Sequence, residues 1–189
     1  KEVSDQGDIA LKKYIKKFDG ADLDSLSVSQ IEIDRAKENV SKELKAAINL
    51  AKSNIEAFHN SQIVQPKKTE TAKGVICWQE KRAIEKVGLY IPGGTAPLFS
   101  TILMLAVPAQ IAGCEKIVMY STVDWLFQAP TTVLYTADLC GVQKIFKIGG
   151  IQAIAALTFG TESVPKVYKL FGPGNQYVTV AKQMALKFD

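Results

Sequence analysis

The second half of the chain alternates short apolar runs with helical stretches, and no other feature of the sequence constrains the fold as strongly. This alternation is typical of parallel βαβ units with right-handed crossovers. The sequence therefore predicts an α/β fold with a Rossmann-like parallel sheet. The expected strands are 87–91, 116–120, 144–148 and 166–171, and the expected helices are 100–112, 131–139, 152–157 and 176–186.

Charge is distributed unevenly between the two halves. Residues 1–88 carry 30 of the 42 Asp, Glu, Lys and Arg residues, whereas residues 89–189 carry 12 of them and 9 of the 13 glycines. Because so few charges cannot solvate a sheet, its faces must be covered by helices, another domain or another subunit. We predict a mainly helical N-terminal region with a β-ribbon over 1–88, as part of a first domain, and a Rossmann-like domain over 89–189.

The N-terminal region carries helical patterns. Apolar residues recur at helical spacing over 11–18 and stop at Gly20, and Ser29 with Glu32 has the form of a capping box. A single apolar stripe then runs from Ile33 to Phe58, which predicts one long helix.

His59 is the only histidine and follows that stripe. We favour an interaction with the last carbonyls of the helix over a catalytic role. Residues 65–73 are polar and are expected to form a linker, and 74–78 are expected to pair with the segment that approaches Gly88.

Composition excludes several classes of protein. A formal net charge of +4 is too small to indicate a nucleic-acid partner, and no apolar run is long enough to span a membrane. Cys77, Cys114 and Cys140 are odd in number and widely spaced, which favours a reducing, cytoplasmic compartment over a disulfide framework. With one histidine and no CxxC, the chain is not expected to build a metal site alone.

Glycine-rich loops follow three of the four predicted strands. In a parallel sheet such loops meet at the carboxyl edge, where open α/β sheets bind ligands. Both G-x-G-x-x-G and G-K-[ST] are missing, so the pattern predicts a crevice for a nucleotide or small anion without naming it, and simple turns are the alternative for each loop. The loops are Pro92, Gly93, Gly94, Thr95, Ala96 and Pro97; Gly149 and Gly150; and Gly172, Pro173, Gly174 and Asn175.

These motifs resemble those of histidinol dehydrogenase. The similar segments are VGLYIPGGTAPLFS over 87–100, GGIQAIAA over 149–156, GPGN over 172–175 and KFDG over 17–20. The resemblance covers essentially the whole chain. It implies a zinc-dependent homodimer that oxidises L-histidinol through the aldehyde to L-histidine, reduces two NAD⁺ and has an incomplete Rossmann-like nucleotide domain.

The same resemblance implies that Tyr90, Gln152 and Asn175 contact NAD. Their positions at the expected carboxyl edge agree with this, since a phenol and two amides can bind ribose or phosphate oxygens. A core tyrosine and two turn-stabilising amides are the alternatives that the residues themselves leave open.

The chain also departs from the family it resembles. Members are more than twice as long, and their later region supplies the zinc ligands (two His, a Gln and an Asp) and the acid–base Glu and His. We therefore predict no catalytic and no metal-binding residue in this chain, and no activity from it alone. The alternative is a non-catalytic α/β binding module that retains the fold.

Two local departures from the family it resembles are also present. Trp125, Leu126 and Phe127 stand where the family commonly has a polar connection, and Ile151 stands where Ala is usual.

Overall fold

The computed structural model describes residues 1–93, 98–122 and 129–188. Its helices are α1 (Glu2–Phe18), α2 (Gln30–Asn39), α3 (Lys42–Asn60), α4 (Phe99–Ile111), α5 (Thr131–Leu139), α6 (Gly150–Phe159) and α7 (Gln176–Ala185). Its strands are β1 (Thr69–Ala72), β2 (Val75–Cys77), β3 (Lys86–Ile91), β4 (Lys116–Ser121), β5 (Lys144–Phe146) and β6 (Lys169–Phe171). In this part of the chain no helix combines the length and the apolar character needed to cross a membrane.

Four strands form the predicted parallel sheet, in the order β5-β4-β3-β6. All four apolar runs and the four helices that follow or separate them are present, with ends shifted by a few residues, so the α/β prediction is confirmed. The strands are apolar because the sheet is covered on both faces.

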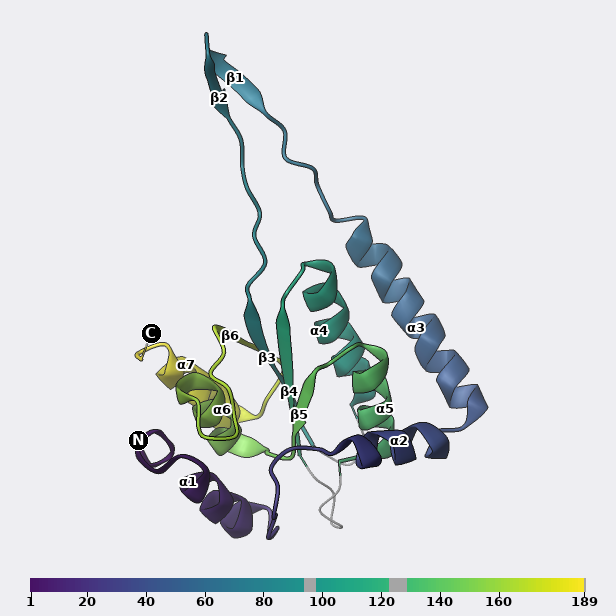
Figure 1. Cartoon of the computed structure of the whole chain (residues 1–189), viewed down its shortest axis with the longest axis vertical. Coiled ribbons are helices and arrows are strands. Elements are labelled where there is room, and N and C mark those ends of the chain that lie inside the picture. The colour runs from purple at the N-terminus through teal and green to yellow at the C-terminus, as the bar shows by residue number, and fades with distance from the viewer. Residues whose placement is uncertain (94–97, 123–128, 189) are drawn as a thin grey trace.

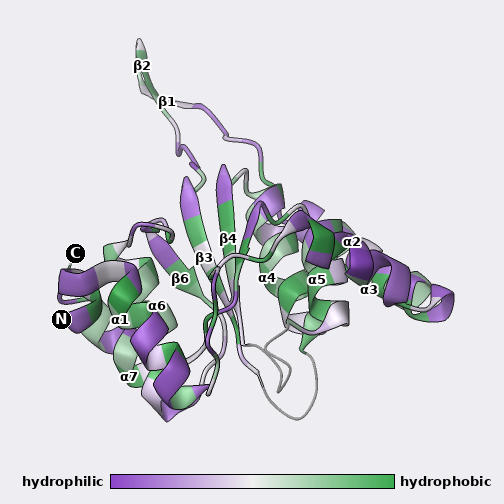
Figure 2. Cartoon of the chain, turned by 60° about the horizontal axis from the view of Figure 1, so that its bottom comes forward, coloured by the Kyte–Doolittle hydropathy of each residue, from purple (hydrophilic) through white to green (hydrophobic). Residues whose placement is uncertain are grey.

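Helices cover both faces of this sheet (Figure 1). On one face α6 packs between α1 and α7, and on the other α4 and α5 lie against the sheet with α3 and α2 packed outside them. Hydrophobic residues gather on the strands and inner helices, whereas the outer helix α3 is largely hydrophilic (Figure 2). The N-terminal helices therefore supply much of the charged surface that the second half lacks. The predicted division into two domains at 88/89 stays a prediction.

The pleat of the strands assigns side chains to two cores. In β4, Val118 and Tyr120 join the core beneath α1 and α6, while Ile117 and Met119 join the core beneath α4 and α5. This alternation follows from the two-residue period of a strand. Phe146 of β5 is fully buried in the first core and stacks on Tyr120, with ring centroids 5.3 Å apart.

The prediction of one long helix over 33–58 is wrong, because the chain breaks between α2 and α3. Val40 has an extended backbone (ψ 129°), and the Ser41 hydroxyl accepts a hydrogen bond from the backbone N–H of Leu44 at 3.2 Å. A serine cap starts a new helix here although the apolar stripe continues in phase. The capping box of Ser29 and Glu32 is confirmed at the start of α2.

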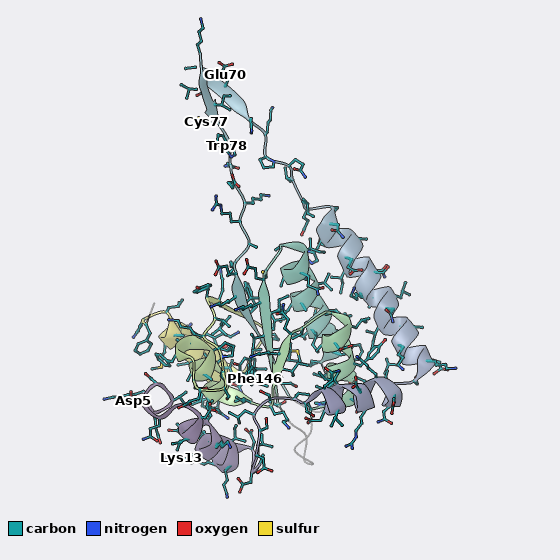
Figure 3. The ribbon with its side chains drawn as sticks, in the orientation of Figure 1. Asp5, Lys13, Glu70, Cys77, Trp78 and Phe146 are labelled. Atoms are coloured by element: carbon teal, nitrogen blue, oxygen red, sulfur yellow. The ribbon has the colours of Figure 1, made fainter. Side chains whose placement is uncertain are left out.

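The predicted ribbon forms with a different partner. β2 pairs antiparallel with β1, which lies inside the expected linker 65–73, whereas the segment that approaches Gly88 belongs to β3 of the main sheet. The correction has a physical reason, since a two-residue turn at Lys73 and Gly74 brings β1 and β2 together locally. Glu70, Cys77 and Trp78 mark this hairpin far from the sheet in Figure 3.

The connection between α1 and α2 runs along the free edge of β5. The N–H of Val28 donates to the Ile145 carbonyl at 2.9 Å, and the N–H of Lys147 donates to the Leu26 carbonyl at 2.8 Å. Ser27 forms an antiparallel bridge with Phe146. These bonds occupy backbone groups that an edge strand otherwise exposes.

Candidate functional site at the carboxyl edge of the sheet

The glycine loops after β3, β5 and β6 meet at one edge of the sheet because these strands are parallel. Gly93 and Gly149 both pack against the Thr122 side chain, so closely that a Cβ on either glycine would overlap it. The edge lies at the opposite end of the sheet from the β1–β2 hairpin, since β3 leads away from the hairpin (Figure 1). The predicted convergence is confirmed for the parts of the loops that the structure describes, whereas Gly94, Thr95, Ala96 and Pro97 lie outside the described residues.

Tyr90, in β3, connects two of these loops. Its side chain is 4% exposed, and its hydroxyl accepts a hydrogen bond from the N–H of Gly150 at 3.1 Å. Burial raises the pKa of the Tyr90 hydroxyl, which keeps it protonated. Gly172 (φ +128°) lies against the Tyr90 backbone so closely that a Cβ would overlap the carbonyl oxygen. Tyr90 thus fixes the start of α6 and lies beside the loop after β6.

Gln152 lies in the first turn of α6 and is 3% exposed. Its side-chain nitrogen donates to Asp19 Oδ2 at 3.4 Å, and its Oε1 lies 2.8 Å from the point where a Cβ on Gly150 would stand. Gln152 also lines a cavity of about 260 Å³ between α1, α6 and α7, to which neither Tyr90 nor Asn175 contributes.

Asn175 is the N-cap of α7, and its Oδ1 accepts a hydrogen bond from the N–H of Val178 at 3.1 Å. Lys182 of the same helix donates from Nζ to the Gly172 carbonyl, which ties the helix to the loop before it. Partial burial lowers the pKa of Lys182. The cap leaves the first N–H groups of α7 at the carboxyl edge, an arrangement that favours anionic groups.

The structure therefore gives each predicted NAD residue an intramolecular role as well as a place at the edge. Tyr90 and Gln152 meet at Gly150, and Asn175 follows the loop that packs on Tyr90. This agrees with the alternatives of a core tyrosine and a turn-stabilising amide. These intramolecular hydrogen bonds do not exclude ligand binding, because an amide or a hydroxyl group can form more than one hydrogen bond. Their contact with NAD stays a prediction.

Comparison with known proteins identifies the family. The family model for histidinol dehydrogenase matches residues 1–188. The chain is 60% identical over 178 residues to histidinol dehydrogenase of Bacteroides fragilis (94% of this chain, 42% of that protein) and 55% identical over 188 residues to that of Escherichia coli strain K12 (99% and 42%). A crystal structure of histidinol dehydrogenase from Elizabethkingia anophelis superposes with a TM-score of 0.97 at 53% identity, covering 99% of this chain and 43% of the other.

The chain belongs to the histidinol dehydrogenase family. It spans about 42% of the length of the curated relatives it matches. The predicted resemblance is confirmed, and so is the Rossmann-like parallel sheet, which this histidinol dehydrogenase structure shares.

Within residues 1–93, 98–122 and 129–188, no group of three or more His, Cys, Asp and Glu side chains could hold a metal ion. The location of the zinc ligands in a later region stays a prediction.

Other residues singled out in the sequence lie away from the edge or outside the described part. His59 lies in the last turn of α3, where its Nδ1 bonds the Gln62 side chain at 2.8 Å. The position in the last turn agrees with the structural role that we favour for His59, and the hydrogen-bond partner that the structure shows is the Gln62 amide just beyond the helix. Ile151 is 46% exposed on α6. The predicted departure at Trp125, Leu126 and Phe127 lies outside the described residues.

Three residues at the edge were missed by the sequence-based prediction. Thr122 is the first residue after β4, and its place beyond a strand could have revealed it, as for the glycine loops. Lys182 lies two turns into α7 and could have been connected with the GPGN turn by helical spacing. Asp19 reaches Gln152 across 133 residues, and no local signal predicts such a contact.

Proposed function

We propose that this chain is the NAD-binding portion of a histidinol dehydrogenase, an enzyme that oxidises L-histidinol through the aldehyde to L-histidine. The observation that carries the proposal is the convergence of three glycine loops, with Tyr90, Gln152 and Asn175, at the carboxyl edge of a sheet in a chain of this family. Ligands of open α/β sheets bind at this edge.

The chain's own residues bind and orient the cofactor in this proposal. NAD⁺, when bound, accepts the hydride that leaves the substrate alcohol. Tyr90 holds the N–H of Gly150 and so fixes the glycine loop against which the cofactor lies. The N-terminus of α7, capped by Asn175, presents N–H groups suited to pyrophosphate oxygens. The described residues do not fit a zinc site, so we assign the zinc-dependent chemistry to the remainder of the enzyme.

The remaining parts of the proposal concern the whole enzyme. We propose a homodimer that acts in the cytoplasm, with zinc and NAD as cofactors and L-histidinol as the substrate. The family membership supports the substrate and the cofactors, and the three widely spaced cysteines support a reducing compartment.

Titration of the chain with NAD⁺ by calorimetry tests the proposal. We expect binding to the unmodified chain, and a dissociation constant about five to ten times higher in Asn175→Ser, because serine retains a capping oxygen and loses the amide. Ser41→Ala is the control, since it removes the cap of α3, a helix that contributes no residue to the three glycine loops, and should leave NAD⁺ binding unchanged. An unchanged dissociation constant in Asn175→Ser removes Asn175 from the site.

An activity assay separates this proposal from the non-catalytic module. The chain alone, supplied with zinc, NAD⁺ and L-histidinol, should form no NADH, because the chemistry is assigned to the remainder. Joined to the later region of a histidinol dehydrogenase of the family, it should form NADH steadily. Failure of the joined protein, with NAD⁺ binding intact, would favour the binding module.

A further inference from the structure

Asp19 makes the one carboxylate contact to a predicted cofactor residue in the described part of the chain. It is the C-cap of α1, directly after Phe18, and its Oδ2 accepts the hydrogen bond from Gln152 Nε2 at 3.4 Å. Partial burial of the carboxyl raises the pKa of Asp19, and the Gln152 hydrogen bond opposes this rise. The contact brings the N-terminal region to the carboxyl edge of the sheet.

This contact distinguishes the two ends of the Gln152 amide. A carboxylate only accepts hydrogen bonds, so it attracts the amide nitrogen and repels the amide oxygen. With the nitrogen held by Asp19, the oxygen Oε1 is the amide atom nearer to Gly150: it lies 2.8 Å from the point where a Cβ on Gly150 would stand, and Nε2 lies 3.3 Å from the same point. Rotation of the amide by 180° would bring two acceptor oxygens together in a side chain that is 3% exposed.

α1 is also attached to the residues that follow α6, at a point just after the break in its backbone at Gly7 (φ 53°, ψ −130°). Asp8 accepts hydrogen bonds at Oδ1 from the hydroxyls of Thr161 at 2.6 Å and Ser163 at 3.0 Å. Its backbone N–H donates to Glu162 Oε2 at 2.8 Å. These residues form the loop that follows α6, and α1 packs along α6 between the two attachments. Asp19 therefore ends a helix that is attached to the α6 region both by the hydrogen bonds of Asp8 and by packing along α6.

We propose that Asp19 is a positioning residue of the cofactor site, whose carboxylate orients the Gln152 amide so that its oxygen faces the glycine loop. The oxygen then accepts a hydrogen bond from a donor group of the ligand, such as a ribose hydroxyl or the carboxamide nitrogen of NAD⁺. This inference rests on the proposed function and adds a residue to it from outside the predicted nucleotide domain.

A double-mutant cycle on the 189-residue chain tests the proposal. Asp19→Asn keeps the shape but removes the preference for one amide orientation, so the dissociation constant for NAD⁺ should rise about fivefold. In a Gln152→Ala background the same substitution should change nothing. Asp24→Asn is the matched control, because Asp24 is exposed in the same connection and its backbone carbonyl, not its carboxyl, accepts a bond from Lys12.

A spectroscopic measurement tests the orientation without ligand. In a ¹⁵N-labelled chain, Asp19→Asn should shift the side-chain NH₂ resonances of Gln152, assigned by their loss in Gln152→Ala, and Asp24→Asn should not. Unshifted resonances, or an equal weakening by Asp19→Asn with and without Gln152, would overturn the role of Asp19. If Gln152→Ala binds NAD⁺ as tightly as the unmodified chain, Gln152 itself leaves the cofactor site, and the function of Asp19 falls with it.

Discussion

The β1–β2 hairpin and the body of the chain, which we define as the four-stranded sheet with its helices, use apolar residues in opposite ways. In the body Tyr120 and Phe146 are fully buried and stack on each other. In the hairpin Ile76 and Trp78 remain 55% and 52% exposed. Residues of similar hydrophobicity thus stabilise one region by burial and contribute little to the other.

Contacts within the hairpin are local. The N–H of Gly74 donates to Glu70 Oε1 at 2.7 Å, and Lys68 Nζ lies 5.5 Å from the centre of the Trp78 ring. A two-stranded hairpin on its own is marginal in water. Both regions form strands, but only the body buries the side chains of its strands. We therefore expect the strands of the body, and not those of the hairpin, to contribute to the free energy of unfolding.

The largest contrast is expected in cysteine reactivity. Cys77 is exposed in the hairpin, whereas Cys140 is buried at the end of α5, and burial raises the pKa of the Cys140 thiol to about 11. The neutral thiol reacts poorly, so Cys77 should react with a thiol reagent at pH 8 at least about a thousand times faster, because Cys140 is exposed only by unfolding. Mass spectrometry of Cys77→Ser and Cys140→Ser chains assigns the rates, and comparable rates would mean that the core opens readily.

Truncation of large side chains should separate the two regions next. Phe146→Ala removes a fully buried ring and its stacking on Tyr120, and should lower the free energy of unfolding by about 3–5 kcal/mol. Trp78→Ala in the hairpin should change it by less than about 0.5 kcal/mol. Urea denaturation followed by circular dichroism measures both, and a large loss in Trp78→Ala would show that the hairpin is packed against something.

Two glycines with positive φ provide a smaller and sharper contrast. Gly172→Ala combines a φ of +128° with overlap of the Tyr90 carbonyl, so the free energy of unfolding should fall by about 2–4 kcal/mol. Gly74 has a φ of +82° with nothing within 4 Å, so Gly74→Ala strains only the hairpin turn. Its effect on global unfolding should stay below about 0.5 kcal/mol, and equal losses in the two variants would contradict the division into body and hairpin.

The smallest effect is expected from removing the hairpin. Replacing residues 67–80 with a short Gly/Ser linker should change the free energy of unfolding by less than about 0.5 kcal/mol, because surface substitutions far from packed features act weakly. Pro66 and Lys81, at the two ends of the deletion, line one hollow, and the linker length is chosen to span the distance between them. NAD⁺ binding should also be unchanged, since the hairpin leaves the opposite end of the sheet. Weaker binding would connect the hairpin with the cofactor site.

Local patterns predicted most of the body. Alternating apolar runs and helices identified the parallel sheet, and the spacing of Ser29 and Glu32 identified a helix start. The carboxyl edge followed from strand direction alone, which is why the convergence of the glycine loops could be expected.

Local patterns did not predict features for which the chain offers two possible structures or a contact between distant segments. β2 could pair with either flanking segment, and the local turn decided in favour of β1. Val40 continues the apolar stripe, so hydrophobic periodicity concealed the break that Ser41 makes. The contact of Asp19 with Gln152 depends on how α1 packs along α6, and that packing is a property of the folded chain.

The strip of backbone from Leu26 to Val28 along β5 has a consequence for synthesis of the protein. Its partners Ile145 and Lys147 lie about 120 residues further along the chain. At about 5–20 residues per second a ribosome needs roughly 6–24 s to add them. During that time α1 and α2 have neither their helix partners nor this edge to bind. The N-terminal segment therefore leaves the ribosome before the residues that bind it in the folded chain have been made.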